Sequence, residues 1–323
     1  MKKHPLVSVI TLSYNNLEKI ECTIRSLLEQ NYPNIEYIIS DDCSDNYNEK
    51  YIKDLVNKFR KDNIKRFVLL KNKENLGTVK NINKAIKHST GEYVIYLSSG
   101  DYFFDKDVIN KIIKRMLKNE SKILSYSRIE YDDNKIIKKI PLRYFYKLLS
   151  QVDTPIKQYK ALVTSRYYDF ASGSAVCIKK EIINKLNFYD ENYILWEDGP
   201  FFAKSNVNNI AIDKAYDICG IYYKTGGVSA KNRRKKESTS KLEKDALMFY
   251  KKVLKENSLI LSRYEKRRIK YSIDKLSIDN NINRTILLLK YMDVVFENQI
   301  IKLKYNKALK KEREYLLKSY EKK

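Results

Sequence analysis

Short apolar segments that run directly into polar or acidic residues constrain the fold of this chain more than any other feature. They are residues 6–12 (LVSVITL), 35–39 (IEYII) and 93–97 (YVIYL), which lead into 13–15 (SYN), 40–42 (SDD) and 98–101 (SSGD). Helical patterns separate these segments, and such an alternation predicts a parallel, doubly wound α/β sheet. Ligands of such a sheet bind outside the carboxyl ends of its strands, so we expect Tyr14, Asp42 and Asp101 to meet at one edge.

The alternation of strands and helices extends along the chain, although it is less regular in the middle third. Apolar residues at helical spacing predict helices in 17–30, 51–59, 82–86 and 109–116, from about 180, and from 199–202. Further strands are expected in 67–70, 123–127, 170–178 and 221–223, with a turn at 131–135. After Ala230 the chain contains no glycine or proline and shows helical patterns to its end. We therefore predict one domain in residues 1–230 and a basic helical region in 231–323.

Size and composition exclude several classes of protein. A chain of 323 residues can bury one large core with a smaller appendage. No apolar run approaches the roughly 20 residues of a membrane-spanning helix. The four cysteines have no CxxC spacing, which argues against a disulfide framework and fits a reducing cytoplasm. The chain has only two histidines, which argues against a histidine-based zinc site and against a Ser-His-Asp triad.

The net charge of +24 is concentrated towards the C-terminus, where residues 231–323 hold 27 Lys/Arg against 12 Asp/Glu. Such a surface attracts anions such as lipid headgroups, phosphorylated substrates or nucleic acid. An alternative is that lysine merely fills solvated helix faces in a protein encoded by A+T-rich DNA. No recognised nucleic-acid module is present.

Two aspartates at the expected strand ends are candidates for binding a nucleotide diphosphate. Asp42 would accept a hydrogen bond from the imide N–H of uracil, and Tyr14 supplies an aromatic ring. Asp101, close to Ser98 and Ser99, is a candidate ligand for Mg²⁺ or Mn²⁺, because these cations prefer carboxylate oxygens. The alternative for both aspartates is that they cap a turn or a helix.

The pair Glu197-Asp198 is the candidate for acid–base chemistry, because a carboxylate beside bulky apolar residues can act as a general base. Asp198 is favoured as the base and Glu197 as a positioning group, with an N-cap of the following helix as the alternative. Lys224, in a glycine-containing turn, would neutralise a leaving diphosphate, although a surface lysine often has no such role. Gly173 and Ser174 are expected to shape the pocket.

Several segments resemble, in order, a family 2 glycosyltransferase with the GT-A fold, of the kind that builds bacterial surface polysaccharides. They are 5–45, which includes PLVSVITLSYNN and EYIISDDCSD, then ENLGTVKNINKAI, GEYVIYLSSGDYFFDKDVI, WEDGPFF and YYKTGGVS. The resemblance covers roughly residues 5–230 and leaves the last 90 or so outside it.

The resemblance implies a role for each candidate residue. Donor binding falls to Leu12, Tyr14, Asp42, Ser99 and Lys224, metal binding to Asp101, and catalysis to Asp198 with Glu197. Two departures stand out. Many members read Leu-Asp-Ser-Asp-Asp where this chain has LSSGD at 97–101, so two acidic positions are lost. Cys43 also replaces the usual glycine.

These observations predict a metal-dependent, inverting glycosyltransferase that uses a UDP-sugar and a glycan or lipid-linked glycan acceptor, for a capsule, O-antigen or similar polymer. We expect it in the cytoplasm, with its basic region against the anionic inner face of the membrane and with a homodimer left open. Nucleic acid is not an expected partner of this enzyme. The alternative is a catalytically inactive basic protein that docks on membrane or nucleic acid.

Overall fold

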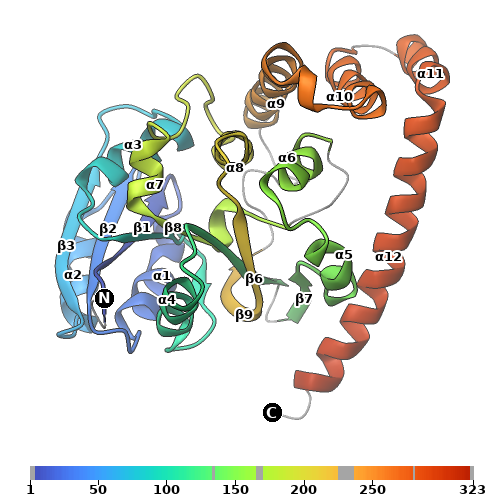
Figure 1. Cartoon of the computed structure of the whole chain (residues 1–323). Coiled ribbons are helices and arrows are strands. Elements are labelled where there is room, and N and C mark those ends of the chain that lie inside the picture. The colour runs from blue at the N-terminus through green and yellow to red at the C-terminus, as the bar shows by residue number, and fades with distance from the viewer. Residues whose placement is uncertain (1–3, 133–134, 165–169, 225–235, 279–280, 321–323) are drawn as a thin grey trace.

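The computed structural model describes residues 4–132, 135–164, 170–224, 236–278 and 281–320. Within these residues the strands form one mixed sheet, and helices cover both of its faces (Figure 1). The long C-terminal helix α12 lies on the side of the molecule opposite α2 and β3 (Figure 1). The predicted α/β fold with C-terminal helices is therefore what the chain adopts.

The strands of the described residues lie in the order β3, β2, β1, β4, β8, β6, β9, β5, and β7 pairs with β6 at the side of this path. Their bounds are β1 Val7–Ser13, β2 Ile35–Asp41, β3 Ile64–Lys71, β4 Tyr93–Tyr96, β5 Tyr102–Phe103, β6 Ile123–Asp132, β7 Lys135–Ile140, β8 Val176–Lys179 and β9 Ile212–Lys224.

The helices follow the strands in chain order. Those of the first half are η1 Leu17–Lys19, α1 Ile20–Leu28, α2 Glu49–Phe59, α3 Thr78–His88, α4 Val108–Lys118, η2 Arg143–Phe145, α5 Tyr146–Ser150 and α6 Pro155–Val163. Those of the second half are η3 Gly173–Ala175, α7 Lys180–Lys185, α8 Asp198–Val207, α9 Lys236–Glu256, η4 Ser258–Ile260, α10 Arg263–Leu276, α11 Asn281–Lys290 and α12 Met292–Tyr320.

The parallel half of the sheet confirms the three strands predicted first. β3, β2, β1 and β4 pair in parallel, and every residue of β2 and β4 is buried. Helices α1, α2 and α4 pack against one face of the sheet and α3 and α7 against the other. Because both faces are covered, β1, β2 and β4 are mostly apolar rather than strictly alternating, whereas the edge strand β3 has exposed Lys65 and Arg66. All their carboxyl ends consequently lie at one edge.

The second half of the sheet departs from a purely parallel arrangement. β8 is antiparallel to both β4 and β6, whereas β6 and β9 are parallel. The predicted turn at 131–135 is wrong for Tyr131, which still belongs to β6 and pairs with Ile136 of β7. The predicted strand at 170–178 is also shorter, because 173–175 form a 3-10 helix before β8. Helices α5 and α6 were not predicted.

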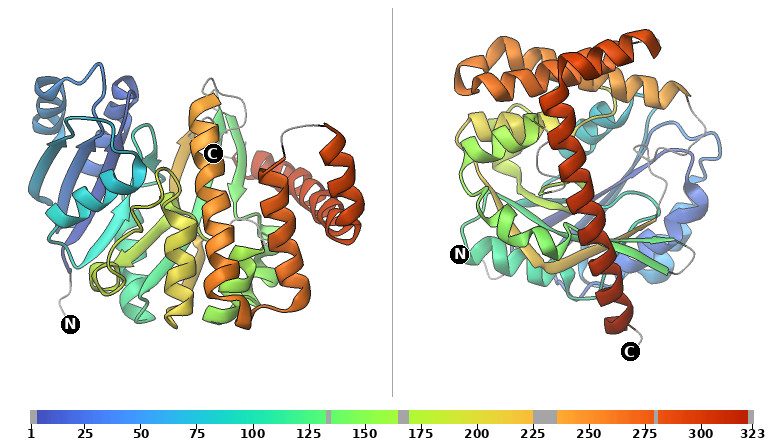
Figure 2. Two further views of the ribbon diagram at one scale, coloured as in Figure 1. Left: turned by 90° about the horizontal axis from the view of Figure 1, so that it is seen from above. Right: turned by 90° about the vertical axis from the view of Figure 1, so that its right-hand side faces the viewer.

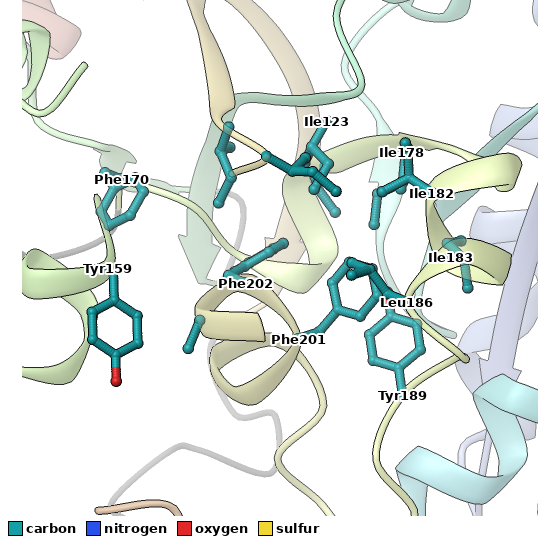
Figure 3. Packing of buried hydrophobic residues seen from close by; sticks show 14 of the residues in the cluster. Ile123, Tyr159, Phe170, Ile178, Ile182, Ile183, Leu186, Tyr189, Phe201 and Phe202 are labelled. Carbon is teal, nitrogen blue, oxygen red and sulfur yellow. The ribbon is translucent and has the colours of Figure 1, made fainter. Parts of the chain in front are cut away.

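A large apolar cluster packs between the sheet and helix α8. Figure 3 shows Phe201 and Phe202 of α8 beneath Ile123 and Ile178 of the sheet. The rings of Tyr189 and Phe201 stack with their centroids 4.4 Å apart. This packing fixes helix α8, and therefore the Glu197-Asp198 pair at its beginning.

The C-terminal helices were predicted after residue 230, and α9 to α12 confirm them. Phe249 and Val253 of α9 and Ile269 of α10 belong to the same cluster as α8. Figure 2 shows α9 and α10 side by side and α12 crossing the end of the molecule. The proposed domain boundary at 230 falls outside the described residues and stays a prediction. No helix in the described ranges is both long and apolar enough to cross a bilayer.

Candidate active site

Hydrogen bonds tie together the ends of β1 and β2. The backbone N–H of Asp42 donates to the carbonyl of Ser13 at 2.9 Å, and the N–H of Asn15 donates to Ser44 Oγ at 2.8 Å. Tyr14 therefore lies at the same edge as Asp42, as expected from the sequence. Its ring is 43% exposed, which leaves a face accessible to a ligand.

The carboxylate of Asp42 holds the turn that begins helix α3. It accepts hydrogen bonds from Asn72 Nδ2 at 2.7 Å, from Leu76 N at 2.9 Å and from Gly77 N at 2.9 Å. Gly77 itself has a φ of +82°, which favours glycine. Asp42 is only 4% exposed. Nucleobase binding by Asp42 stays a prediction, beside a structural role that the sequence did not reveal.

Leu12 and Ser99 lie next to each other where β1 and β4 end. The N–H of Ser99 donates to the carbonyl of Leu12 at 3.0 Å, and Ser99 Oγ donates to the carbonyl of Asn16 at 3.1 Å. Asn16 Nδ2 returns a hydrogen bond of 2.6 Å to the carbonyl of Ser99. The fold thus brings both predicted donor-binding residues to the edge that holds Tyr14.

Asp101 follows β4, and its backbone is anchored from helix α1. Thr23 Oγ1 donates to the carbonyl of Asp101 at 2.7 Å and accepts from the N–H of Gly100 at 2.9 Å. Burial raises the pKa of the Asp101 carboxyl to about 7, and the positive charge of Arg128 opposes this rise. In the described part of the chain no residue forms an ion pair or side-chain hydrogen bond with this carboxylate. A carboxylate with a raised pKa and no direct ion-pair partner in the described residues fits one ligand of a divalent cation.

The backbone has a positive φ at one position of each departure from the family pattern. Gly100 has a φ of +99°, where an aspartate would be strained by about 1 kcal/mol or more. Cys43 has a φ of +66° and therefore occupies the left-handed conformation that suits the usual glycine. No group of three or more His, Cys, Asp or Glu in the described residues could hold a metal. Asp101 would therefore hold a cation together with the phosphates of a donor.

Glu197 and Asp198 lie at the beginning of helix α8, where the helix dipole favours negative charge. Asp198 is the first helical residue rather than the N-cap. Its Oδ2 accepts a hydrogen bond from Gly173 N at 2.9 Å, and its Oδ1 accepts one from Gly199 N at 2.7 Å. A Cβ at position 173 would lie 2.8 Å from Glu197 Oε1 and 3.2 Å from Asp198 Cβ. Only glycine therefore allows this close approach.

The Glu197 carboxyl has a raised pKa. Burial raises the pKa of the Glu197 carboxyl, and the negative charge of the neighbouring Asp198 raises it further. Two adjacent carboxylates in a buried site seldom ionise together. Burial and the neighbouring charge thus both favour the protonated form of Glu197. The roles of Glu197 and Asp198 stay a prediction.

Arg128 of β6 lies near both Asp101 and the residues that hold Asp198. The sequence did not single it out. Its Nη1 donates to Ser174 Oγ at 2.7 Å, and its guanidinium lies 4.8 Å from the ring centroid of Tyr223. Its buried Nε has no hydrogen-bond partner among the described residues. A single arginine after an apolar strand segment gives only a weak sequence signal. In the fold it lies between Asp101 and the turn that holds Asp198.

Lys224 is the last residue of β9, and its backbone pairs with Tyr131 of β6. Its side chain lies outside the described residues, as does the remainder of the predicted glycine-containing turn. The role of Lys224 therefore stays a prediction.

The comparisons with known proteins define the class. The pattern of the family described as Glycosyl transferase family 2 matches residues 8–186, so the chain belongs to this family. It is 32% identical over 167 residues to the putative teichuronic acid biosynthesis glycosyltransferase TuaG of Bacillus subtilis, covering 52% of this chain and 57% of TuaG. It is 34% identical over 132 residues to the UDP-Glc:alpha-D-GlcNAc-diphosphoundecaprenol beta-1,3-glucosyltransferase WfaP of Escherichia coli, covering 41% and 49%. The chain thus spans about half the length of these two relatives.

Solved structures place the fold among GT-A glycosyltransferases. Residues 1–349 of Staphylococcus aureus TarS, in complex with UDP-GlcNAc, match with a TM-score of 0.58 and 18% identity, over 84% of this chain and 71% of that one. The mannosyltransferase PcManGT of Pyrobaculum calidifontis, in complex with GDP-Man and Mn²⁺, matches with a TM-score of 0.57 and 14% identity, over 100% and 89%. These identities support the fold alone. The predicted family and fold are confirmed.

Proposed function

We propose that this chain is an inverting glycosyltransferase that moves a sugar from a UDP donor to a hydroxyl group of a glycan acceptor during cell-surface polysaccharide synthesis. The observation that carries this proposal is Asp198, held by two backbone N–H groups at the start of a helix and linked through Arg128 to the Asp101 edge. The names of TuaG and WfaP support the surface-polysaccharide role.

In the proposed reaction, Asp198 is the general base. Asp198 takes the proton of an acceptor hydroxyl while the oxygen of that hydroxyl attacks the anomeric carbon of the donor sugar. The bond from this carbon to the β-phosphate oxygen breaks on the opposite face, and UDP leaves. One displacement of this kind inverts the anomeric configuration. Glu197, protonated, holds its neighbour in place and adds no second charge.

The donor is held by groups from four strand ends. Tyr14 stacks on the nucleobase and Asp42 binds it. Leu12 and Ser99 line the donor site beside Tyr14. Arg128, assisted by Lys224, stabilises the charge that develops on the departing diphosphate. Mg²⁺ or Mn²⁺ on Asp101 would supply further positive charge there.

A titration of UDP into the purified chain, followed by calorimetry, tests the donor site. We expect binding with Mn²⁺ that weakens when EDTA replaces the metal. Arg128→Met should weaken UDP binding by about tenfold or more, because a hydrogen bond to a charged group contributes about 1.5–3 kcal/mol. The control Arg25→Met removes an exposed arginine that pairs with Glu29 and lies over the ring of Phe59, and it should bind UDP like the unmodified chain. If UDP, GDP and CDP all fail to bind under both conditions, the alternative of an inactive binding protein is favoured.

Turnover is measured as UDP release with two donors and one acceptor. UDP-glucose and UDP-GlcNAc are the donor probes, since WfaP uses UDP-Glc and TarS was solved with UDP-GlcNAc. The acceptor probe is GlcNAc-diphosphoundecaprenol, the lipid-linked sugar in the name of WfaP. Release that depends on the acceptor distinguishes transfer from hydrolysis.

The C-terminal helices carry an apolar strip that fits an anionic membrane surface at the cytoplasmic face. The strip consists of exposed residues three or four positions apart on α11 and α12, which are Leu289, Met292, Phe296, Ile300 and Leu303. Exposed lysines continue and flank it at 302, 304, 307, 310 and 311. An apolar ridge bordered by lysine is typical of helices that lie on anionic lipid.

Vesicle sedimentation tests this membrane-binding strip. We expect the chain to sediment with vesicles of phosphatidylcholine and phosphatidylglycerol but not with phosphatidylcholine alone. Phe296→Ser with Leu303→Ser should weaken binding at least about tenfold, because each buried apolar side chain contributes about 1.5–3 kcal/mol. The control Leu259→Ser changes a leucine that is 98% exposed but lies outside the strip. A dimer in sedimentation equilibrium that this double variant dissociates, without vesicle binding, would instead assign the strip to a second copy.

A further inference from the structure

The three residues before the acidic pair donate their backbone N–H groups to one carboxylate from helix α9. Asp245 Oδ2 accepts from Ile194 at 3.0 Å, from Leu195 at 2.7 Å and from Trp196 at 3.0 Å, while its Oδ1 accepts from Ile194 at 3.1 Å. Asp245 is only 2% exposed. Three successive backbone N–H groups that point at one anion form a concave anion-binding site. Without Asp245 these N–H groups would need water as their hydrogen-bond acceptor.

Aromatic packing holds the same segment against helix α9. The ring of Trp196 lies 5.0 Å from that of Phe249 at an interplanar angle of 67° and 6.4 Å from that of Tyr250. A Cβ at Gly199 would lie 2.5 Å from the Trp196 ring, so the indole also packs beneath the first turn of α8. Any movement of Trp196 would therefore reach the helix that begins with Asp198.

The segment is also connected to the donor side of the site. The carbonyl of Ile194 accepts a hydrogen bond from Val79 N at 3.2 Å, at the beginning of α3. Just before α3, the backbone N–H groups of Leu76 and Gly77 donate to the carboxylate of Asp42. A continuous set of hydrogen bonds thus runs from Asp42 through 194–196 to Asp245.

From this geometry we infer that Asp245 of the C-terminal helix α9 is a positioning residue, which fixes segment 194–196 so that Asp198 faces the acceptor. Asp245 does not touch the substrates itself. The inference rests on the proposed function, because it assigns Asp198 as the base. It also makes α9 part of the catalytic architecture, although the family pattern ends at residue 186.

Asp245→Asn tests the inference, because it keeps the size of the side chain but replaces one accepting oxygen with a donating NH₂ group. We expect kcat to fall about ten- to hundredfold, since small misplacement of a catalytic group has effects of this size. The Kd for UDP should change less than about twofold, because the donor contacts remain. Trp196 is the single tryptophan of the chain, so its fluorescence reports on the segment directly. Its emission should shift to longer wavelength and its quenching by acrylamide should increase.

Glu312→Gln is the matched control, because it also neutralises a buried carboxylate on a C-terminal helix. Glu312 of α12 binds Arg143 and lies far along the chain from the acidic pair. It should lower the melting temperature without changing kcat or the Trp196 emission. Unchanged kcat and emission in Asp245→Asn would overturn the inference, as would a loss of kcat matched by the control. If the unmodified chain binds no nucleotide and shows no turnover, the proposed function itself fails, and the variant plays no part in that result.

Discussion

Asp198→Asn is expected to lower kcat for sugar transfer by about 10²–10⁴-fold, the usual contribution of a general base. Asparagine has nearly the same shape as aspartate, and its carbonyl can still accept a hydrogen bond from Gly173 or Gly199. It cannot take the proton of the acceptor hydroxyl, however. The Kd for UDP should be unchanged, because the donor contacts at Tyr14, Asp42 and Arg128 are intact.

Glu197→Gln provides the comparison that separates the two acidic residues. Because burial and the charge of Asp198 raise the pKa of Glu197, this side chain is already uncharged near neutral pH. Its replacement by the neutral glutamine should therefore have a much smaller effect than Asp198→Asn. UDP release with the lipid-linked acceptor measures both variants, and Asp62→Asn, at an exposed position, serves as the control. Greater damage from Glu197→Gln would reverse the two roles.

The parallel half of the fold was predictable because each of its elements has a local signal. The central strands β1, β2 and β4 are mostly apolar, since both faces of the sheet are covered there. Each run ends at residues whose polarity marks the carboxyl edge, which is how Tyr14, Asp42 and Asp101 could be placed together. The expected strand at 123–127 was too short, because β6 is extended by pairing with both β7 and β9. Pairing between distant strands leaves no local trace in the sequence.

The position of Glu197 and Asp198 at the beginning of a helix could be predicted, but the contacts that hold Asp198 in place could not. Asp198 binds Gly173 N, and Arg128 binds Ser174, through contacts that only the folded chain brings together. Asp245 occurs in the sequence KLEKDAL, where an acidic residue among lysines resembles an ordinary solvated helix face. Its burial depends on how α9 packs against 194–196. The sequence therefore indicated the chemistry of the site better than the means by which that chemistry is positioned.

Asp101→Asn is expected to stabilise the metal-free protein, and increasingly so as the pH rises. Burial raises the pKa of Asp101 in the folded protein from 3.8 to about 7. Between these two values the unfolded chain has lost its proton while the folded protein still binds it. The unfolded state binds fewer protons, so the free energy of unfolding falls as the pH rises through this window. Asparagine does not ionise, so the free energy of unfolding of the variant does not fall in this way.

The gain in the free energy of unfolding should grow by about 2.5–3 kcal/mol between about pH 5 and pH 8. The reason is that the unfolded carboxyl is already ionised over about two pH units before the folded one loses its proton, and one pKa unit corresponds to about 1.4 kcal/mol. Urea unfolding in the presence of EDTA measures it, with Asp54→Asn on the exposed face of α2 as a control that should show no such trend. Mn²⁺ added together with UDP at pH 8 should stabilise the unmodified chain more than Asp101→Asn, because a cation bound with the donor phosphates compensates the charge of Asp101. An identical gain at both pH values would contradict a buried, uncompensated carboxylate at Asp101. A residue that weakens the fold and strengthens ligand binding is the expected signature of a site kept for function rather than stability.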